Sequence, residues 1–213
     1  MRRSPRSRWM MAALLALSTS ACSGRERALG LWFADDACVL RAGAMDRFGE
    51  PLSAEERSLV AQVARGEVEQ AFSELRVRIA DSADAFWRLG VVRSMPARST
   101  RALPRAGESV ALGMLGGGGT VACDVVARKA INFAPASAVR ADVVTAIGRG
   151  VGRTAVHEFV HQILGAAVGH DDADTDSYEH GSSDRASQYY GALHWTIAWP
   201  ELRRRLGVRS ATS

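Results

Sequence analysis

The sequence lacks several features that mark common functional classes. Its 213 residues contain no internal repeat and no apolar run long enough for a comfortable membrane-spanning helix. Lys and Arg number 27 against 23 Asp and Glu, and four arginines within the first eight residues account for the surplus. No basic stripe with interleaved aromatic residues is present, which argues against a nucleic-acid partner. The length and apolar content predict one globular domain with a substantial core.

A phosphate-binding loop is also missing. Gly116–Gly119 form a run of four glycines, but no Gly-Lys-Ser/Thr follows and no dinucleotide fingerprint occurs. The strand-like segments 109–115 and 120–126 flank the run. We therefore expect a flexible hairpin connection, placed where it could border a substrate cleft.

The first 21 residues predict a secretion signal. An arginine-rich start precedes a short apolar run that ends in small residues. The end of this run, Thr19-Ser20-Ala21-Cys22, resembles the bacterial lipobox, although Thr19 stands where leucine is usual. This resemblance implies a lipid on Cys22, a membrane anchor and a place in the bacterial cell envelope. The alternative is a plain signal cleaved near Ala21, which would leave the protein secreted or periplasmic.

The chain has three cysteines. If Cys22 carries lipid, Cys38 and Cys123 remain as a pair, and disulfides persist in the compartments that exported proteins reach. The alternative is that both are buried free thiols.

Residues 22–51 show little periodicity and are interpreted as a tether and N-terminal segment, followed by the main domain at 52–213. Ser53 and Glu56 form a capping box that predicts a helix. Alternation over 75–79 predicts a strand, and residues 86–92 predict a second one. Residues 94–108 are expected to be a polar loop.

The C-terminal half is predicted to be mainly helical. A helical pattern begins near Ser137, and Gly148, Gly150 and Gly152 are expected to break it or to permit close packing. A helix is predicted from about Arg153 to Gly165 or Gly169. After an acidic loop, Ser183 or Asp184 can cap another helix over 185–199, with a short last turn between Pro200 and Gly207. The order of elements predicts an α+β fold.

His157, Glu158 and His161 fit the pattern H-E-x-x-H. Two residues four apart on a helix share a face, so both imidazoles can reach one metal ion. Glu158 lies beside them and can take a proton from zinc-activated water. The alternative is that both histidines are ordinary polar positions of an amphipathic helix.

These residues resemble the zincin metallopeptidases. The resemblance is specific over about 150–180, and upstream it covers only the order of elements. It implies a twisted, mostly parallel sheet with the H-E-x-x-H helix packed beneath it, Zn²⁺ as cofactor, and peptide or protein as substrate. It also assigns ligand roles to His157 and His161 and the general-base role to Glu158. The expected fold is thus a zincin-like twisted mixed sheet with this active-site helix and a C-terminal helix.

Three zincin patterns offer different third ligands. "HQILGAAVGH" resembles a lengthened metzincin turn, which implies His170, but no methionine follows Met114 to form the methionine turn. Tyr178 could fill that space. The aspzincin pattern points to Asp172 or its neighbour Asp171, and the gluzincin pattern points to Glu179. We expect His170 to complete the site, with Asp171 and Asp172 accepting hydrogen bonds from ligand ring N–H groups.

Other polar residues near the motif have simpler interpretations. The four aspartates between 171 and 176 suit a solvated loop, because the glycine and glutamate of an EF-hand calcium loop are missing. Tyr178, Tyr189 and Tyr190 are candidates to bind an oxyanion, although packing explains each of them more simply. His180 and His194 are spare histidines.

The sequence thus predicts an exported zinc metallopeptidase, anchored to the membrane by lipid, in which a glutamate activates water. The alternative is a catalytically silent zincin-like envelope lipoprotein that serves as a binding module.

Overall fold

The computed structural model describes residues 27–41, 43–96, 105–112, 116–165 and 168–210. The predicted leader and Cys22 lie outside these residues. The chain forms one five-stranded mixed sheet with several helices, which confirms the predicted α+β class. Among the described residues, no helix has both the length and the apolar character that a membrane span requires.

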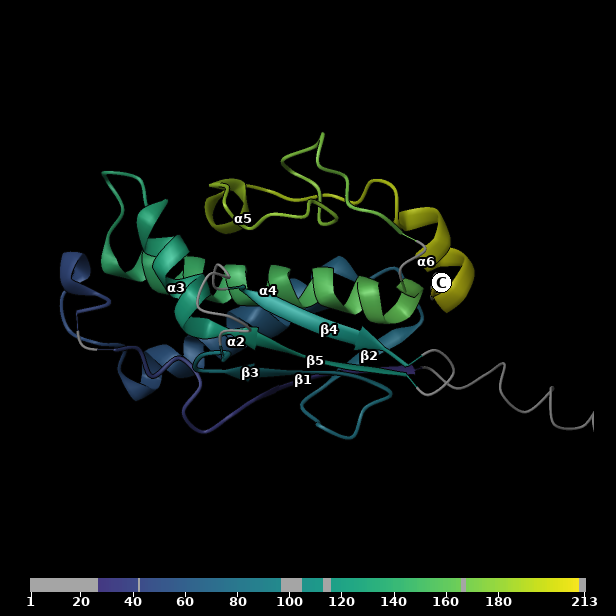
Figure 1. Ribbon diagram of the computed structural model, residues 1–213, viewed down its shortest axis with the longest axis horizontal. Coiled ribbons are helices and arrows are strands. Elements are labelled where there is room, and N and C mark those ends of the chain that lie inside the picture. The colour runs from purple at the N-terminus through teal and green to yellow at the C-terminus, as the bar shows by residue number, and fades with distance from the viewer. Residues whose placement is uncertain (1–26, 42, 97–104, 113–115, 166–167, 211–213) are drawn as a thin grey trace, which may run out of the picture.

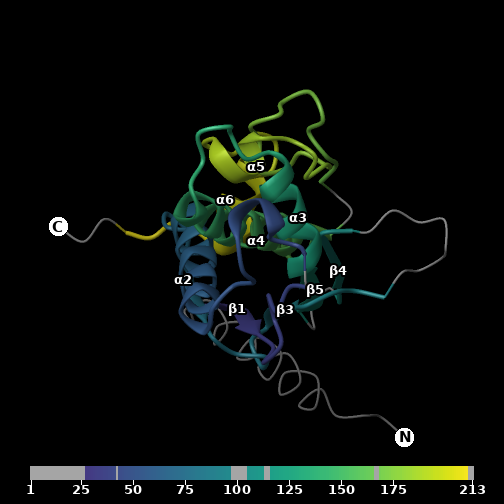
Figure 2. The same ribbon diagram turned by 90° about the vertical axis from the view of Figure 1, so that its left-hand side faces the viewer.

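The sheet has the strand order β2-β1-β3-β5-β4. Its strands are β1 (Arg27–Phe33), β2 (Val77–Ala80), β3 (Trp87–Val92), β4 (Gly107–Ala111) and β5 (Gly117–Ala122). Neighbouring strands are parallel except β4, which lies antiparallel to β5 at one edge. Figures 1 and 2 show the longer helices gathered on one side of this sheet.

The helices are η1 (Asp46–Phe48), α2 (Ala54–Ala71), α3 (Cys123–Asn132), α4 (Arg140–Leu164), α5 (Ser187–Tyr190) and α6 (Trp199–Leu206). The predicted capping box of α2 is confirmed, since Ser53 Oγ accepts from the Glu56 amide and Glu56 Oε2 accepts from the Ser53 amide. The predicted strands β2 and β3 are confirmed as well.

The expected tether overlaps the sheet. Residues 27–33 form β1, which lies between β2 and β3, and Leu29 and Leu31 are completely buried. The described fold therefore extends back to Arg27, well before the boundary expected at residue 52. Five of its seven residues are apolar, and its pairing with β2 and β3 makes it an inner strand.

One helix, α4, runs unbroken through the glycines that were expected to interrupt it or to permit close packing. Only the second expectation is confirmed. A Cβ at Gly148 would meet Val63 at 2.7 Å, and a Cβ at Gly152 would meet the Ala64 carbonyl oxygen at 2.5 Å. The absence of side chains at these glycines lets α2 and α4 approach closely, and α4 stays helical through them.

The run Gly116–Gly119 is only partly a hairpin connection, because Gly117–Gly119 belong to strand β5. A Cβ at Gly117 would meet Gln162 at 2.7 Å. Gln162 instead lies over this glycine, accepting from the Arg88 amide and donating to its carbonyl, each at 3.2 Å. Gly117 thus leaves room for the side chain that holds α4 against the sheet. The strand predicted over 120–126 also ends early, because α3 begins at Cys123.

The helix predicted over 185–199 is wrong. Within this range Ser187–Tyr190 form α5 and Trp199 begins α6, while the backbone is extended at Gly191. Further on, the His194 amide donates to Asp176 and its carbonyl accepts from Tyr178, each at 3.0 Å. Pairing with a distant segment satisfies backbone groups that a helix would have used. The short last helix, α6, forms as expected, and Gly207 follows it as the C-cap.

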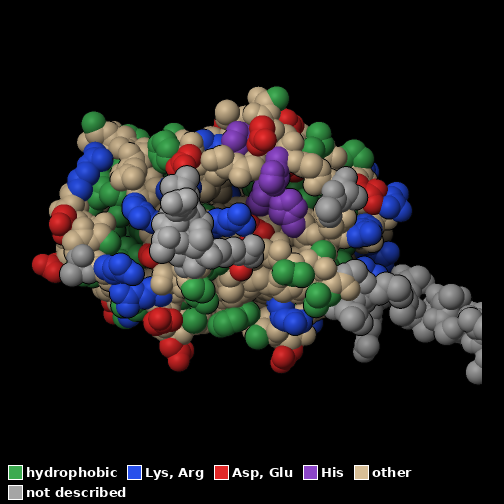
Figure 3. Space-filling view, viewed as in Figure 1, with side chains coloured by type: hydrophobic (Ala, Val, Ile, Leu, Met, Phe, Trp, Pro, Cys, Tyr) green, Lys and Arg blue, Asp and Glu red, His purple; other side chains and the backbone are tan. Residues whose placement is uncertain are grey.

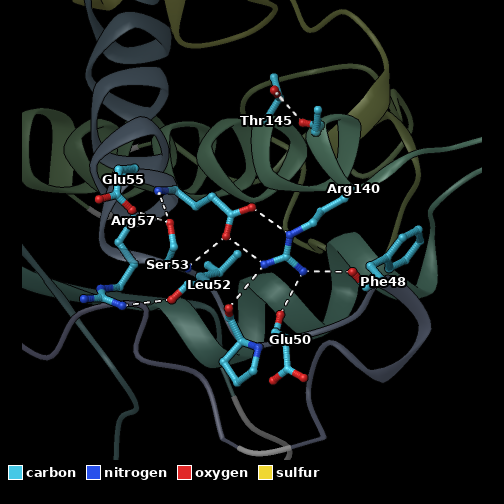
Figure 4. Close-up of polar contacts among 11 residues, drawn as sticks. Phe48, Glu50, Leu52, Ser53, Glu55, Arg57, Arg140 and Thr145 are labelled. Carbon is cyan, nitrogen blue, oxygen red and sulfur yellow. Dashed lines mark hydrogen bonds and ion pairs between the residues drawn. The ribbon is translucent and has the colours of Figure 1, made fainter.

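Two long-range links join the N-terminal half to α3 and α4. Cys38 and Cys123 form a disulfide across 85 residues of sequence. Arg140, at the start of α4, binds the Glu56 carboxylate with two nitrogens at 2.7 Å and also donates to the carbonyls of Phe48, Glu50 and Pro51 (Figure 4). This arginine connects the loop before α2 to the starts of both long helices.

Candidate metal centre

Three histidine rings meet near the C-terminal end of α4. His157 and His161 lie one helical turn apart, and their Nε2 atoms are 3.0 Å from each other. After α4 ends, the chain brings His170 Nε2 to 3.2 Å from His161 Nε2. Among the described residues, this is the one group of three or more histidine, cysteine or acidic residues whose candidate ligand atoms all lie within 4.8 Å of one another.

The spacing of these nitrogens suits zinc. Zn–N bonds of about 2.0–2.1 Å in a tetrahedral arrangement place two nitrogens about 3.3 Å apart. The two observed separations are close to this value. Nitrogen atoms this close would repel each other if each carried only a lone pair, and a shared cation removes that repulsion.

Hydrogen bonding sets the tautomer of His157. Its Nδ1 lies 3.0 Å from the Tyr178 carbonyl oxygen. A carbonyl can only accept, so Nδ1 carries the proton and Nε2 keeps its lone pair in the neutral ring. Burial lowers the pKa of His157, although the Tyr178 carbonyl opposes this. Burial is also the main cause that lowers the pKa of His161, followed by its neighbour His157. Both rings are therefore neutral near pH 7, as metal ligands must be.

His170 is exposed and depends on its surroundings for position. A Cβ on Gly181 would lie 2.7 Å from His170 Nδ1. The Gly181 amide donates to Asp172 Oδ1 at 3.0 Å, so Asp172 fixes the turn against which His170 rests. The Asp171 amide donates to the Glu179 carbonyl at 3.2 Å. Among the described residues, neither aspartate accepts a hydrogen bond from a ring N–H group of the three histidines.

Glu179, one of the alternative third ligands, is engaged elsewhere. Its side chain is 2% exposed. The carboxylate accepts from Ser177 Oγ at 2.6 Å and from the Ala198 and Thr196 amides at 2.8 and 3.1 Å. These bonds make Glu179 an anchor between two loop segments, and Asp171, Asp172 and Glu179 all lie outside the histidine group.

Glu158 lies beside the histidines and is 7% exposed. Its Oε2 accepts from Ser109 Oγ on β4 at 2.7 Å. Burial raises the pKa of Glu158, and the hydrogen bond from Ser109 partly offsets this. Gly107 leaves room for the carboxylate, because a Cβ there would approach Glu158 Oε1 to 2.7 Å. Helix α4 and the edge strand together therefore hold a carboxylate that can accept a proton.

The three histidines and Glu158 line a cleft of about 820 Å³. Residues 105–109 form one wall, α4 forms the floor, and segment 178–188 contributes the opposite wall. Figure 3 shows histidine side chains at the surface of this face, with Lys and Arg side chains beside them. The histidine group is therefore accessible to a molecule of peptide size.

The tyrosines have distinct positions. Tyr178 lines the cleft, and its ring packs on Trp195 with centroids 4.7 Å apart. Burial raises its pKa, so the phenol stays protonated. Tyr189 is fully buried and donates to the Ser183 carbonyl, while Tyr190 donates to the Ala130 carbonyl. The last two therefore have packing roles.

The two spare histidines stay outside the group. His194 Nε2 lies 2.9 Å from Asp174 Oδ2. His180 lines the cleft, and its Nδ1 accepts from the Ser182 amide.

Several supporting residues have no signature in the sequence. Ser109 could be recognised only as part of a strand, since its contact with Glu158 spans 49 residues. Arg185 is 8% exposed and donates to the carbonyls of Thr175 and Ser177, next to Tyr178. Its guanidinium therefore supports the segment that orients His157. The sequence matches no protein-family model and no curated protein.

Proposed function

We propose that this protein is an exported zinc-dependent peptidase with a zincin-like fold. The observation that carries the proposal is the meeting of His157, His161 and His170 beside Glu158 in one open cleft. Three imidazole ligands leave a four-coordinate zinc one position for water. The mostly parallel sheet with α4 packed against it is compatible with the zincin family.

The edge strand supports an extended peptide as the substrate. Among the described residues, β4 pairs only with β5, so its outer edge has no strand partner. Val110 is 61% exposed on this strand. Backbone N–H and C=O groups along a free edge can pair with an added extended chain. Such a chain would run beside Ser109 and Glu158, close to the histidines.

Each group would have a defined task in peptide hydrolysis. When bound, zinc supplies a Lewis acid that makes a water molecule more acidic and polarises the substrate carbonyl. The Glu158 carboxylate accepts a proton from water as the water oxygen bonds to the carbonyl carbon of the substrate. Glu158 then gives this proton to the departing nitrogen as the C–N bond breaks. Ser109 holds the carboxylate in place, and the Tyr178 carbonyl orients His157.

The main test separates metal binding from proton transfer. Glu158→Gln should keep about one zinc per chain, because the glutamate does not hold the metal, while cleavage of denatured casein falls by at least about 10²-fold. His170→Ala should lose zinc, His194→Ala should retain it, and Asp172→Ala should weaken zinc binding without abolishing it, because Asp172 supports the turn beside His170. Undiminished turnover in Glu158→Gln would contradict the mechanism. Retention of zinc by His170→Ala together with its loss from Asp172→Ala would make that aspartate the third ligand.

The alternative, a silent binding module, has a separate outcome in this experiment. A wild-type protein that holds zinc in its folded state but cleaves no peptide would support it.

We also propose that Cys22 carries the lipid anchor. Cys22→Ala should then abolish acyl labelling and remove the protein from the membrane fraction.

A further inference from the structure

One end of the molecule is strongly basic. It comprises the starts of β1 and β2 together with α6 and the residues after it. Figure 1 shows α6 and the C-terminal end of the chain at this end. Five exposed arginines lie here, and we call them the arginine end: Arg27, Arg76, Arg78, Arg203 and Arg205.

Backbone pairing brings the segments that carry these arginines to the same end of the molecule, although Arg27 and Arg78 leave opposite faces of the sheet. Arg27 pairs with Val77, and Ala28 pairs with Arg78. The Arg76 amide donates to the Gly207 carbonyl at 3.0 Å, so the segment after α6 lies directly beside the start of β2. Segments that are far apart in sequence thus bring their charges together.

The charge of the arginine end is largely uncompensated. None of its five arginines forms an ion pair with a described residue. The Arg27 guanidinium lies over the rings of Phe86 and Trp87, with centroid distances of 5.6 and 5.3 Å. Glu201 is paired with Arg204, and Glu74 is an exposed acidic residue close by. The excess of positive charge at this end is local, because basic and acidic residues are equal in number after the first eight residues.

We propose that the arginine end binds an anionic phospholipid surface and orients the domain on the membrane. Cys22, the expected lipid-bearing residue, precedes Arg27 by only five positions. Five residues span at most about 18 Å even when fully extended. A lipid on Cys22 would therefore hold this end, and no other, close to the headgroups. Electrostatic attraction acts over about 8 Å at physiological salt, which makes this short tether sufficient.

This binding goes beyond peptidase activity and does not need it. Lipid on Cys22 would supply the anchor, and the arginines would supply orientation and additional affinity, since one lipid signal is often supported by a basic patch. The two contributions can be separated by testing a chain without lipid. Every described helix and strand lies between residues 27 and 210, so a chain that begins at Ser23 keeps the whole described fold.

The experiment measures co-sedimentation of this unlipidated chain with vesicles. Vesicles of phosphatidylethanolamine and phosphatidylglycerol should bind it, and vesicles of phosphatidylcholine alone should not. The double variant Arg76→Glu, Arg78→Glu should bind the anionic vesicles at least about 25-fold more weakly, because each arginine near the surface contributes about fivefold. High salt should abolish binding.

A charge-matched control is Arg41→Glu with Arg128→Glu. Both are exposed and lie away from the arginine end, near the disulfide-linked loop and on α3. This control should keep vesicle binding. Arg27→Gln with Arg203→Gln provides a second loss-of-binding pair if the first variant folds poorly by circular dichroism.

Three results would overturn the proposal. These are equal binding to neutral and anionic vesicles, equal loss in the control pair, or equally tight binding to single-stranded DNA, which would indicate general polyanion binding. Acyl labelling of full-length protein is measured separately, so failure here leaves the proposals on Cys22 and on hydrolysis untouched.

Discussion

At the scale of single residues, neighbouring groups prepare the proposed site for metal. The Tyr178 carbonyl keeps the proton of His157 on Nδ1, and burial favours the neutral ring. Ser109 gives the Glu158 carboxylate a fixed direction. His170 is the most exposed of the three histidines, and its ring lies against Gly181, which has no side chain to displace it. A small change at that glycine should therefore affect metal binding more than folding.

Gly181→Ala tests this dependence. The added methyl group would approach His170 Nδ1 to 2.7 Å and Asp172 Oδ1 to 2.9 Å, so the ring must move. Zinc affinity is expected to fall by about 10–100-fold, the usual effect of disturbing a ligand's support. Gly169→Ala is the matched control, because a Cβ there has no neighbour within 4 Å. Competition with a fluorescent chelator measures both affinities. Equal affinities in the two variants would show that Gly181 does not position His170.

At the scale of elements, α4 combines packing and chemistry. Its glycines let it pack closely against α2, and Gln162 holds it to the backbone of β3 across Gly117. The same helix carries His157, Glu158 and His161 toward β4. Close packing over the buried length of the helix therefore fixes the position of these three side chains relative to the edge strand.

Two glycine substitutions should have opposite effects on stability. Gly152→Ala would force a methyl group to 2.5 Å from the Ala64 carbonyl oxygen and should lower the free energy of unfolding by about 1–3 kcal/mol. Gly66→Ala, within α2, meets nothing within 4 Å and should raise it by about 0.5–1 kcal/mol. Urea denaturation of both variants measures these changes. A stabilising Gly152→Ala would mean that α2 and α4 are not tightly packed there.

The link between α2 and α4 should depend on pH. Hydrogen bonding from Arg140 is the main cause that lowers the pKa of Glu56. A carboxylate with a lowered folded-state pKa contributes its full stability above the ordinary value of 4.5 and loses it as pH falls through the lowered value. Arg140→Ala should therefore cost about 1–3 kcal/mol at neutral pH and progressively less below pH 4.5.

Unfolding in urea at a series of pH values tests the link. Glu56→Gln serves as the control, since the cost of Arg140→Ala in that background should no longer vary over this acidic range. A cost that is the same at every pH in the wild-type background would place the stabilisation in the carbonyl contacts of Arg140.

At the scale of the whole molecule, long-range links assemble the cleft. The disulfide joins the loop after β1 to the start of α3. Beyond α4, Glu179 and Arg185 bind backbone groups of the C-terminal segments and keep Tyr178 beside His157. The far wall of the cleft therefore consists largely of irregular chain, held by buried charged side chains.

Loss of the disulfide should destabilise the entire fold. Replacing Cys38 and Cys123 together by alanine is expected to lower the free energy of unfolding by about 2–5 kcal/mol, because the bridge restricts the unfolded chain. Cys22→Ala should leave stability unchanged. Denaturation curves with and without reductant provide the measurement. Free alkylation of both Cys38 and Cys123 in folded, unreduced protein would show that the bond is not formed.

The sequence by itself determined features that depend on residues close together in the chain. The capping box of α2 needs only Ser53 and Glu56 three positions apart. The spacing of His157 and His161 places both on one face of any helix that contains them, because a helix repeats every 3.6 residues. His170 could be proposed because a glycine after the helix lets the chain turn back. Such short-range geometry depends on neighbouring residues and does not depend on long-range contacts.

Only the tertiary structure decided which distant groups meet. Ser109 reaches Glu158 because β4 lies antiparallel to β5 at the edge of the sheet, and no local pattern encodes that register. The group that orients His157 is a backbone carbonyl, which every residue possesses. The segment after Tyr190 had a helical pattern, yet its backbone pairs with residues 176–178. Such outcomes depend on the combined free energy of packing and long-range hydrogen bonds, which exceeds local preference and has no signature in neighbouring residues.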